Sequence, residues 1–197
     1  MKTLSKLLVF ILFFSFTNCV TAQKKTPAEI MGIKMLKQKS VKGKSNEYRI
    51  VVYSNTRSYI INKENVYDKV LPNYNLTEYD SMPFGRLSDE DIAKLRQFTT
   101  ELIGDYVSEA PKTEKYGDFI NIKMYSDMQE NIKDLEFGIP NYVSIPIEMI
   151  EQLEVYVKKN MKLHFKINRV NQNANYMFSY IGIQLEPIRK AKRMKGK

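Results

Sequence analysis

The sequence of 197 residues predicts an α+β fold, a mostly antiparallel sheet with two helices packed on it. Short runs rich in Tyr, Ile and Val occur in pairs separated by short polar segments, which is typical of antiparallel strands. Two longer segments carry apolar residues at three- and four-residue spacing, which is typical of helices with one buried face. Sheet and helices together predict a layered domain.

The first part of the predicted domain is a hairpin followed by a loop and a helix. Residues 47–54 and 57–62 form the strands of the hairpin, and residues 63–86 form a polar loop. Ser88 is expected to cap the helix, because acidic residues follow it at the positive end of the helix dipole. Pro111 is expected to end it. The apolar residues of its predicted buried face are Ile92, Leu95, Phe98, Leu102, Ile103 and Tyr106.

The second part is predicted to contain a strand, a turn, a second strand and a helix, followed by two further strands. Strands are predicted at 119–125, 132–137, 161–169 and 176–186. Ser144 is expected to cap the second helix, with Pro146 in its permissive first turn, Lys158 and Lys159 at its end, and Ile147, Ile150, Leu153 and Val157 on its inner face.

The amino-terminal 22 residues have the pattern of a secretory signal peptide. A basic start precedes a short apolar run at 7–16, and small residues up to Ala22 favour cleavage before Gln23. The run is shorter than the roughly 20 apolar residues needed to cross a bilayer. We therefore expect a periplasmic or secreted protein whose mature chain contains no cysteine, which excludes disulfides and thiol chemistry. The alternative is lipidation at Cys19.

Basic ends flank the predicted single domain at 45–187, which has two sub-parts, 45–117 and 118–187. The amino-terminal arm at 23–44 holds seven lysines against one glutamate, and the carboxyl-terminal tail at 188–197 holds six basic residues. Such tails suggest weak contact with an anionic surface, and the alternative is that they keep the protein soluble. Nucleic acid is not expected as a partner, because the tails lack aromatic residues for base stacking. The candidate contacts in the tail are Arg189, Lys190, Lys192 and Arg193.

Exposed aromatic residues are expected in the polar loop. Tyr67, Tyr74 and Tyr79 lie outside the predicted core, and exposed aromatic rings can contact sugars or peptides. They are the predicted contacts for an envelope protein or a glycan.

Catalytic, cofactor and metal sites are not predicted. The single histidine, His164, is expected on the polar face of its strand, and no Gly-rich phosphate loop occurs. Glu151 and Glu154 share a helix face and would suit acid/base work if buried in a cleft, although such pairs are usually solvated. The sequence thus predicts a non-enzymatic binding module. The alternative is a small carboxylate-dependent hydrolase acting on an envelope or extracellular substrate, and the oligomeric state stays open.

A family resemblance adds to these expectations. The signal ending at Gln23, the run 132–137, the helix ending in Lys158 and Lys159, and the closing strand pair resemble small exported proteins of unknown function from Bacteroides-like bacteria. Asp80-Ser81-Met82 resembles the O-glycosylation acceptor motif of such bacteria, which implies modification at Ser81.

A second resemblance concerns the order of elements. Residues 118–168 are similar in element order to the carboxyl-terminal domain of TonB-type energy transducers, which pair with transporters through a sheet edge. This resemblance implies that binding through an exposed strand edge is a possible mode for the chain.

Overall fold

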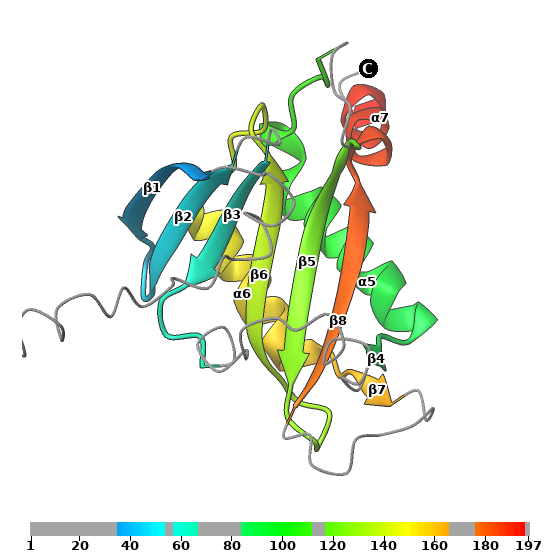
Figure 1. Cartoon of the computed structure of the whole chain (residues 1–197). Coiled ribbons are helices and arrows are strands. Elements are labelled where there is room, and N and C mark those ends of the chain that lie inside the picture. Colours follow the sequence, from blue (N-terminus) through cyan, green and yellow to red (C-terminus); the bar gives the residue numbers. More distant parts are fainter. Residues whose placement is uncertain (1–34, 54–56, 67–83, 112–116, 166–175, 196–197) are drawn as a thin grey trace, which may run out of the picture.

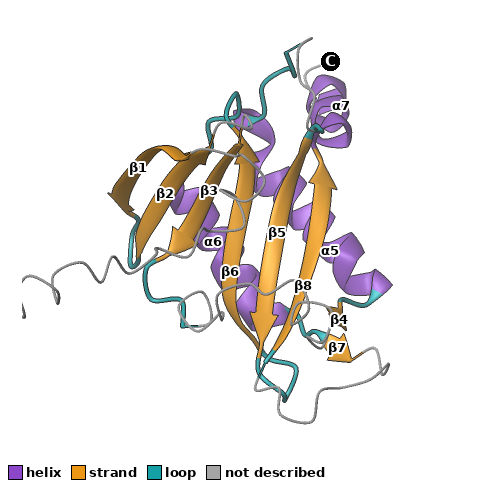
Figure 2. Cartoon of the chain, in the orientation of Figure 1, coloured by secondary structure: helices purple, strands orange, loops and turns teal. Residues whose placement is uncertain are grey.

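The protein is an antiparallel sheet covered on one face by helices, which confirms the predicted α+β class. The computed structural model describes residues 35–53, 57–66, 84–111, 117–165 and 176–195. The six strands of the main sheet lie in the order β1-β2-β3-β6-β5-β8, and each neighbouring pair is antiparallel. Helices α5 and α6 lie against one face, behind the sheet in Figure 1 and Figure 2. The strands are β1 (Met35–Lys42), β2 (Glu47–Tyr53), β3 (Arg57–Asn62), β5 (Phe119–Ser126), β6 (Ile132–Pro140) and β8 (Met177–Gln184).

Two predicted hairpins build the centre of the sheet. β2 and β3 pair with Tyr48 opposite Asn62, and β5 and β6 pair with Ile122 opposite Phe137. β3 joins the two hairpins by pairing with β6, where Ile60 lies opposite Phe137. These positions place alternate apolar side chains of neighbouring strands on the face that the helices cover.

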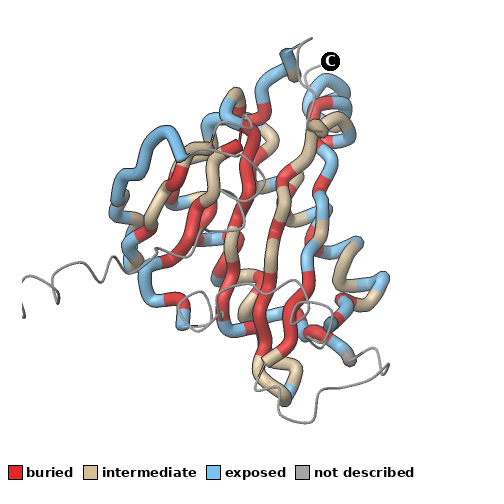
Figure 3. Tube along the Cα trace, viewed as in Figure 1, coloured by how far each residue is buried: buried red, intermediate tan, exposed pale blue. Residues whose placement is uncertain are grey.

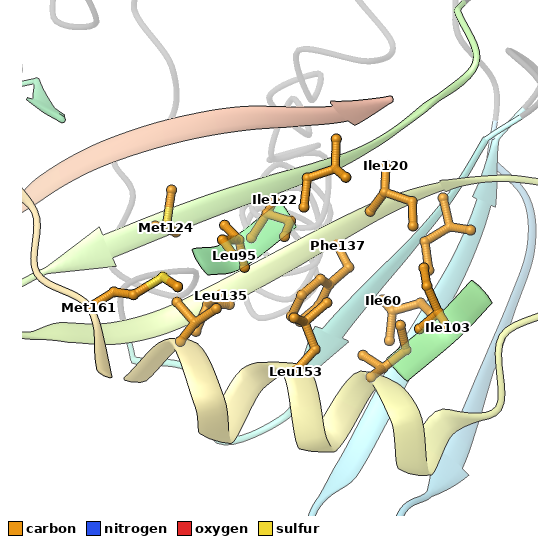
Figure 4. Packing of buried hydrophobic residues seen from close by; sticks show 14 of the residues in the cluster. Ile60, Leu95, Ile103, Ile120, Ile122, Met124, Leu135, Phe137, Leu153 and Met161 are labelled. Atoms are coloured by element: carbon orange, nitrogen blue, oxygen red, sulfur yellow. The ribbon is translucent and has the colours of Figure 1, made fainter. Parts of the chain in front are cut away.

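The core lies between the sheet and the two long helices. Ile122, Phe137 and Leu135 point from the sheet toward α6, where Leu153 meets them (Figure 4). Long stretches of the central strands are buried, as the red segments of Figure 3 show, and the buried isoleucines Ile120 and Ile122 lie at alternate positions of β5. Leu95 and Ile103 of α5 complete the apolar layer.

Helix α5 (Asp89–Ile103) begins as the sequence predicts and ends earlier. The Ser88 hydroxyl accepts a hydrogen bond from the backbone N–H of Asp91 at 3.0 Å, which confirms the cap. The helix passes into a short 3₁₀ turn, η1 (Gly104–Tyr106), so the prediction that Pro111 ends it was wrong. Tyr106 is 37% exposed and does not extend the buried face.

Helix α6 (Ile147–Asn160) buries the predicted face but begins differently. The four apolar residues expected on its inner face are all buried. Pro146 is its capping residue, with a carbonyl that accepts from the N–H of Met149, and no side chain caps the helix. The prediction that Ser144 caps α6 was therefore wrong, since Ser144 lies two residues before the capping position.

The carboxyl-terminal segment is a third helix and not a solvated tail. β8 ends at Gln184, and α7 (Leu185–Lys195) follows directly, so the predicted strand at 176–186 is two residues too long. Leu185 and Ile188 are buried at the spacing of one helical face. The apolar spacing that predicts a helix is hard to see here, because basic residues surround Leu185 and Ile188.

The amino-terminal arm contributes an edge strand. Residues of the predicted basic arm from Met35 to Lys42 form β1, which pairs with β2, so the domain includes these residues. Val41 is the only apolar residue of β1 that is even half-buried. An apolar alternation was therefore missing from the sequence of this strand.

A small second sheet contains part of the predicted strand at 161–169. β7 (His164–Phe165) pairs with β4 (Gly85–Arg86), and residues 166–175 lie outside the described part of the chain. Met161 and Leu163 are buried. The His164 side chain is half exposed, as predicted, and its Nδ1 lies 3.1 Å from the Glu130 carboxylate. Within the described ranges, no helix is long and apolar enough to cross a membrane.

We predict that Arg189→Ala lowers the free energy of unfolding by about 2 to 4 kcal/mol, measured by urea denaturation. Arg189 is 4% exposed, donates hydrogen bonds to the Asp118 carboxylate and the Ser108 carbonyl, and forms an ion pair with Asp118, all of which the substitution removes. Arg193→Ala on the same helix is the matched control. Arg193 is 55% exposed, so its loss should change the free energy by less than about 1 kcal/mol. Equal effects of the two variants would contradict this role of Arg189.

Candidate functional site

The predicted binding residues fall into two groups. Tyr67, Tyr74, Tyr79 and Ser81 lie outside the described residues, as do Cys19 and the predicted signal peptide. The structure describes the second group, the four predicted contacts of the carboxyl-terminal segment, and places all of them on α7.

Arg189 holds α7 to the rest of the domain. It forms ion pairs with Asp118 and with Glu186 on its own helix, and Asp118 also accepts a hydrogen bond from the Tyr142 hydroxyl. The side chain is buried, so it is not a surface contact for a partner.

The other three predicted contacts on α7 are exposed but lie next to acidic side chains. Lys190 lies 3.8 Å from Glu186, and Lys192 lies 3.6 Å from Asp105. Arg193 lies 2.9 Å from Glu109. The positive charge of these three residues is therefore largely balanced on the protein itself.

A polar cluster that the sequence did not predict lies where the β1–β2 turn, residues 43–46, meets α6. The Glu151 carboxylate accepts hydrogen bonds from the successive backbone N–H groups of Lys44, Ser45 and Asn46, at 2.5, 2.8 and 2.9 Å. Successive N–H groups of a turn form a concave site for an anion. Glu151 is 6% exposed, so this carboxylate of α6 fixes the turn from inside the protein.

The carboxylate of Glu154, one helical turn further along α6, binds residues of β2 and β3. Its carboxylate accepts hydrogen bonds from the Tyr48 hydroxyl at 2.7 Å and from the Asn62 amide at 3.1 Å. Lys158 pairs with it at 2.5 Å from the next turn of α6. Glu154 is 2% exposed, and the structure thus corrects the expectation that this carboxylate pair is solvated.

The environment of Tyr48 follows from this contact. Burial raises the pKa of the Tyr48 hydroxyl far above that of an ordinary tyrosine, and the hydrogen bond to Glu154 and its negative charge raise this pKa further. The hydroxyl therefore remains a hydrogen-bond donor at every ordinary pH.

An open groove lies on the outer side of α6, and we call it the α6 groove. Its volume is about 660 Å³, and it is bordered by the turn 44–46, by Phe98 of α5 and by a stripe of α6 from Glu148 to Asn160. The rings of Phe98 and Tyr156 stack in its wall, with centroids 3.8 Å apart and planes 6° from parallel.

The second surface feature is the free edge of β1. β1 pairs with β2 alone among the described strands, so its other side presents backbone N–H and C=O groups. Met35 and Leu36 are 58% and 65% exposed. Lys37, Lys39 and Lys42 lie along the same strand, and within the described part of the chain no acidic side chain pairs with them.

A metal site is not evident in the parts of the chain that the structure covers. No group of three or more His, Cys, Asp or Glu side chains there could hold a metal ion.

Comparisons with known proteins find a similar solved structure. No protein-family model matches the sequence, and no curated protein matches it. The crystal structure of a DUF5043 family protein from Bacteroides uniformis ATCC 8492 is similar, with a TM-score of 0.47 and 14% sequence identity, covering 75% of this chain and 85% of that chain.

We predict that Gly43→Ala destabilises the turn and lowers the free energy of unfolding by about 1 to 3 kcal/mol in urea denaturation. A Cβ at Gly43 would lie 2.7 Å from Glu151 Oε2, so the carboxylate would have to leave its three N–H partners. Gly104→Ala is the matched control, because Gly104 has helical dihedral angles and its Cβ would meet nothing closer than 3.9 Å. The control should be neutral or stabilising. A neutral Gly43→Ala would contradict the importance of the turn contact.

We predict that Tyr48→Phe makes stability less sensitive to alkaline pH. The folded protein keeps the Tyr48 proton to higher pH than the unfolded chain does, so this stabilisation is complete below about pH 10 and is lost as the pH rises further. Urea denaturation across this range should show a shallower decline for the variant, together with a loss of about 1 kcal/mol at neutral pH. Tyr59→Phe, which removes a half-buried tyrosine hydroxyl from the same hairpin, is the matched control. Identical slopes for wild type and Tyr48→Phe would disprove the assignment.

Proposed function

We propose that the protein is an exported, non-enzymatic binding protein that pairs with an extended, acidic segment of a partner protein along the edge of β1. The export proposal rests on the predicted signal peptide. Amino-terminal sequencing of the exported protein tests it, and the mature chain should begin at Gln23. The observation that carries the binding proposal is the free edge of β1 with its unpaired lysines. An extended peptide that adds to such an edge gains main-chain hydrogen bonds along its whole length.

The position of β1 suits this role. Val41 contributes the strand's half-buried apolar contact, and Met35 and Leu36 are exposed at its start. The strand lies at the edge of the sheet, next to β2 (Figure 1). A partner strand would extend the sheet without displacing any described element.

The charge of the edge favours an acidic partner. Residues 35–46 contain four lysines and no acidic residue, and the nearby Glu47 pairs with Lys63 at 2.6 Å. Lysines on an edge oppose pairing with a second copy of the same edge, because like charges would face one another. The same lysines attract a strand that carries Asp or Glu, so charge supplies selectivity as well as attraction.

The alternative hydrolase would need carboxylates that are free to act on a substrate. Glu151 and Glu154 are buried, but each has three hydrogen-bonding partners within the protein. These contacts use both groups to hold the turn and the strands, which supports the binding proposal over the enzyme.

A defined acidic peptide tests the proposal. A ten-residue peptide of alternating Val and Glu should protect the backbone amides of β1 from hydrogen exchange, and its affinity should fall as salt is added. A peptide of alternating Val and Lys should not bind. Protection confined to another element, or binding of both peptides alike, would contradict pairing at β1.

Charge-reversal variants separate the edge from general electrostatics. Replacing Lys37, Lys39 and Lys42 by Glu should weaken binding of the acidic peptide by about tenfold or more. Replacing Lys94, Lys190 and Lys192 by Glu changes the total charge equally and should leave most of the affinity. Equal losses in the two triple variants would show that only net charge matters and would overturn the proposed site.

A further inference from the structure

The α6 groove uses no residue of β1, although the turn after β1 forms part of its rim, and it has its own chemistry. It follows one stripe of α6 from Glu148 through Gln152 to Asn160, and these twelve helical steps span about 18 Å at 1.5 Å per residue. The groove is thus elongated and open along its length. Its shape suits a short chain of ring-sized groups better than a single compact ligand.

Apolar surface forms the middle of the groove. Val155 is 55% exposed, although it is a valine on a helix of a folded domain. Beside it, the stacked rings of Phe98 and Tyr156 are half-buried and add a flat aromatic wall. Flat apolar surface of this kind packs against the C–H faces of a ring.

Polar groups of both kinds surround this surface. The Glu151 carboxylate is already occupied by the turn, but the Lys44 and Lys159 ammonium groups and the Tyr156 hydroxyl have no hydrogen-bond partner within the described ranges. Glu148, at the other end from Lys159, supplies a carboxylate acceptor. Two lysines and two glutamates line the groove, so their formal charges balance.

Balanced charge with both donors and acceptors matches a ligand that is uncharged and rich in hydroxyl groups. A hydroxyl group donates one hydrogen bond and accepts others, so it can meet an ammonium group, a carboxylate or an amide. A strongly acidic or basic ligand would instead meet a group of its own sign.

We propose that the α6 groove binds a short, linear, uncharged saccharide, with one ring packed on Val155 and the aromatic wall. Its hydroxyls bond to the polar side chains along the stripe, including Gln152 and Lys159. This site goes beyond the proposed function, because it uses no residue of β1. The turn that Glu151 holds keeps the rim of the groove formed before a ligand arrives, which reduces the ordering cost of binding.

Titration with defined trisaccharides, followed by NMR of the full mature chain, tests the site. Maltotriose, cellotriose and N-acetylated chitotriose are the uncharged probes, and trigalacturonate is the acidic comparison. At least one uncharged probe should bind with a millimolar dissociation constant and shift the amide signals of Val155, Tyr156 and Lys159. No shift with any uncharged probe at tens of millimolar, or tighter binding of trigalacturonate, would overturn the proposal.

Two exposed valines provide a matched pair of variants. Val155→Arg fills the middle of the groove and should weaken the bound trisaccharide about tenfold or more. Val66→Arg changes a valine of similar exposure, 59%, away from the groove and should leave the affinity unchanged. Retained affinity in Val155→Arg would place the sugar elsewhere and overturn the site. If Val155→Arg melts early, Gln152→Ala, which removes an exposed side chain, gives the same test with a smaller expected loss.

Discussion

The two buried carboxylates of α6 hold the β1 end of the protein together. Glu151 binds three N–H groups of the turn 43–46, and Glu154 binds Tyr48 of β2 and Asn62 of β3. A carboxylate buried without partners costs several kcal/mol, so the helix position and the register of these strands depend on each other. Both proposed binding surfaces border this junction, and its rigidity sets how each is presented.

Polar contacts fix the position of β1 because the strand buries little apolar surface. Only Val41 of the strand packs partly against the core, whereas β5 and β6 bury an apolar residue at every second position. β1 is therefore positioned by its backbone pairing with β2 and by the fixed turn that joins them. An edge held in this way keeps its outer hydrogen-bonding groups in line for another strand, and its lysines oppose aggregation with further copies of the same edge.

The sequence predicted the elements whose apolar residues repeat with a clear period. The hairpins of β2 with β3 and of β5 with β6, and the buried faces of α5 and α6, all have this signal. β1 and α7 were missed, because lysines and arginines outnumber their few buried residues. The burial of Glu151 and Glu154 was also missed, since a helix pattern shows which residues share a side but not which distant turn covers them. The partners of Glu151 lie more than 100 positions away in the sequence.

The basic residues at the two ends of the domain have different environments, although both ends are similarly rich in lysine or arginine in the sequence. On α7, Arg189 is buried against Asp118, and Arg193 lies next to Glu109, so that charge holds the helix in place. On β1, Lys37 and Lys39 have no acidic neighbour among the described residues, so their attraction remains available to another molecule. Electrostatic attraction of an acidic partner should therefore act mainly at the β1 edge, where backbone groups can turn a weak encounter into a paired strand.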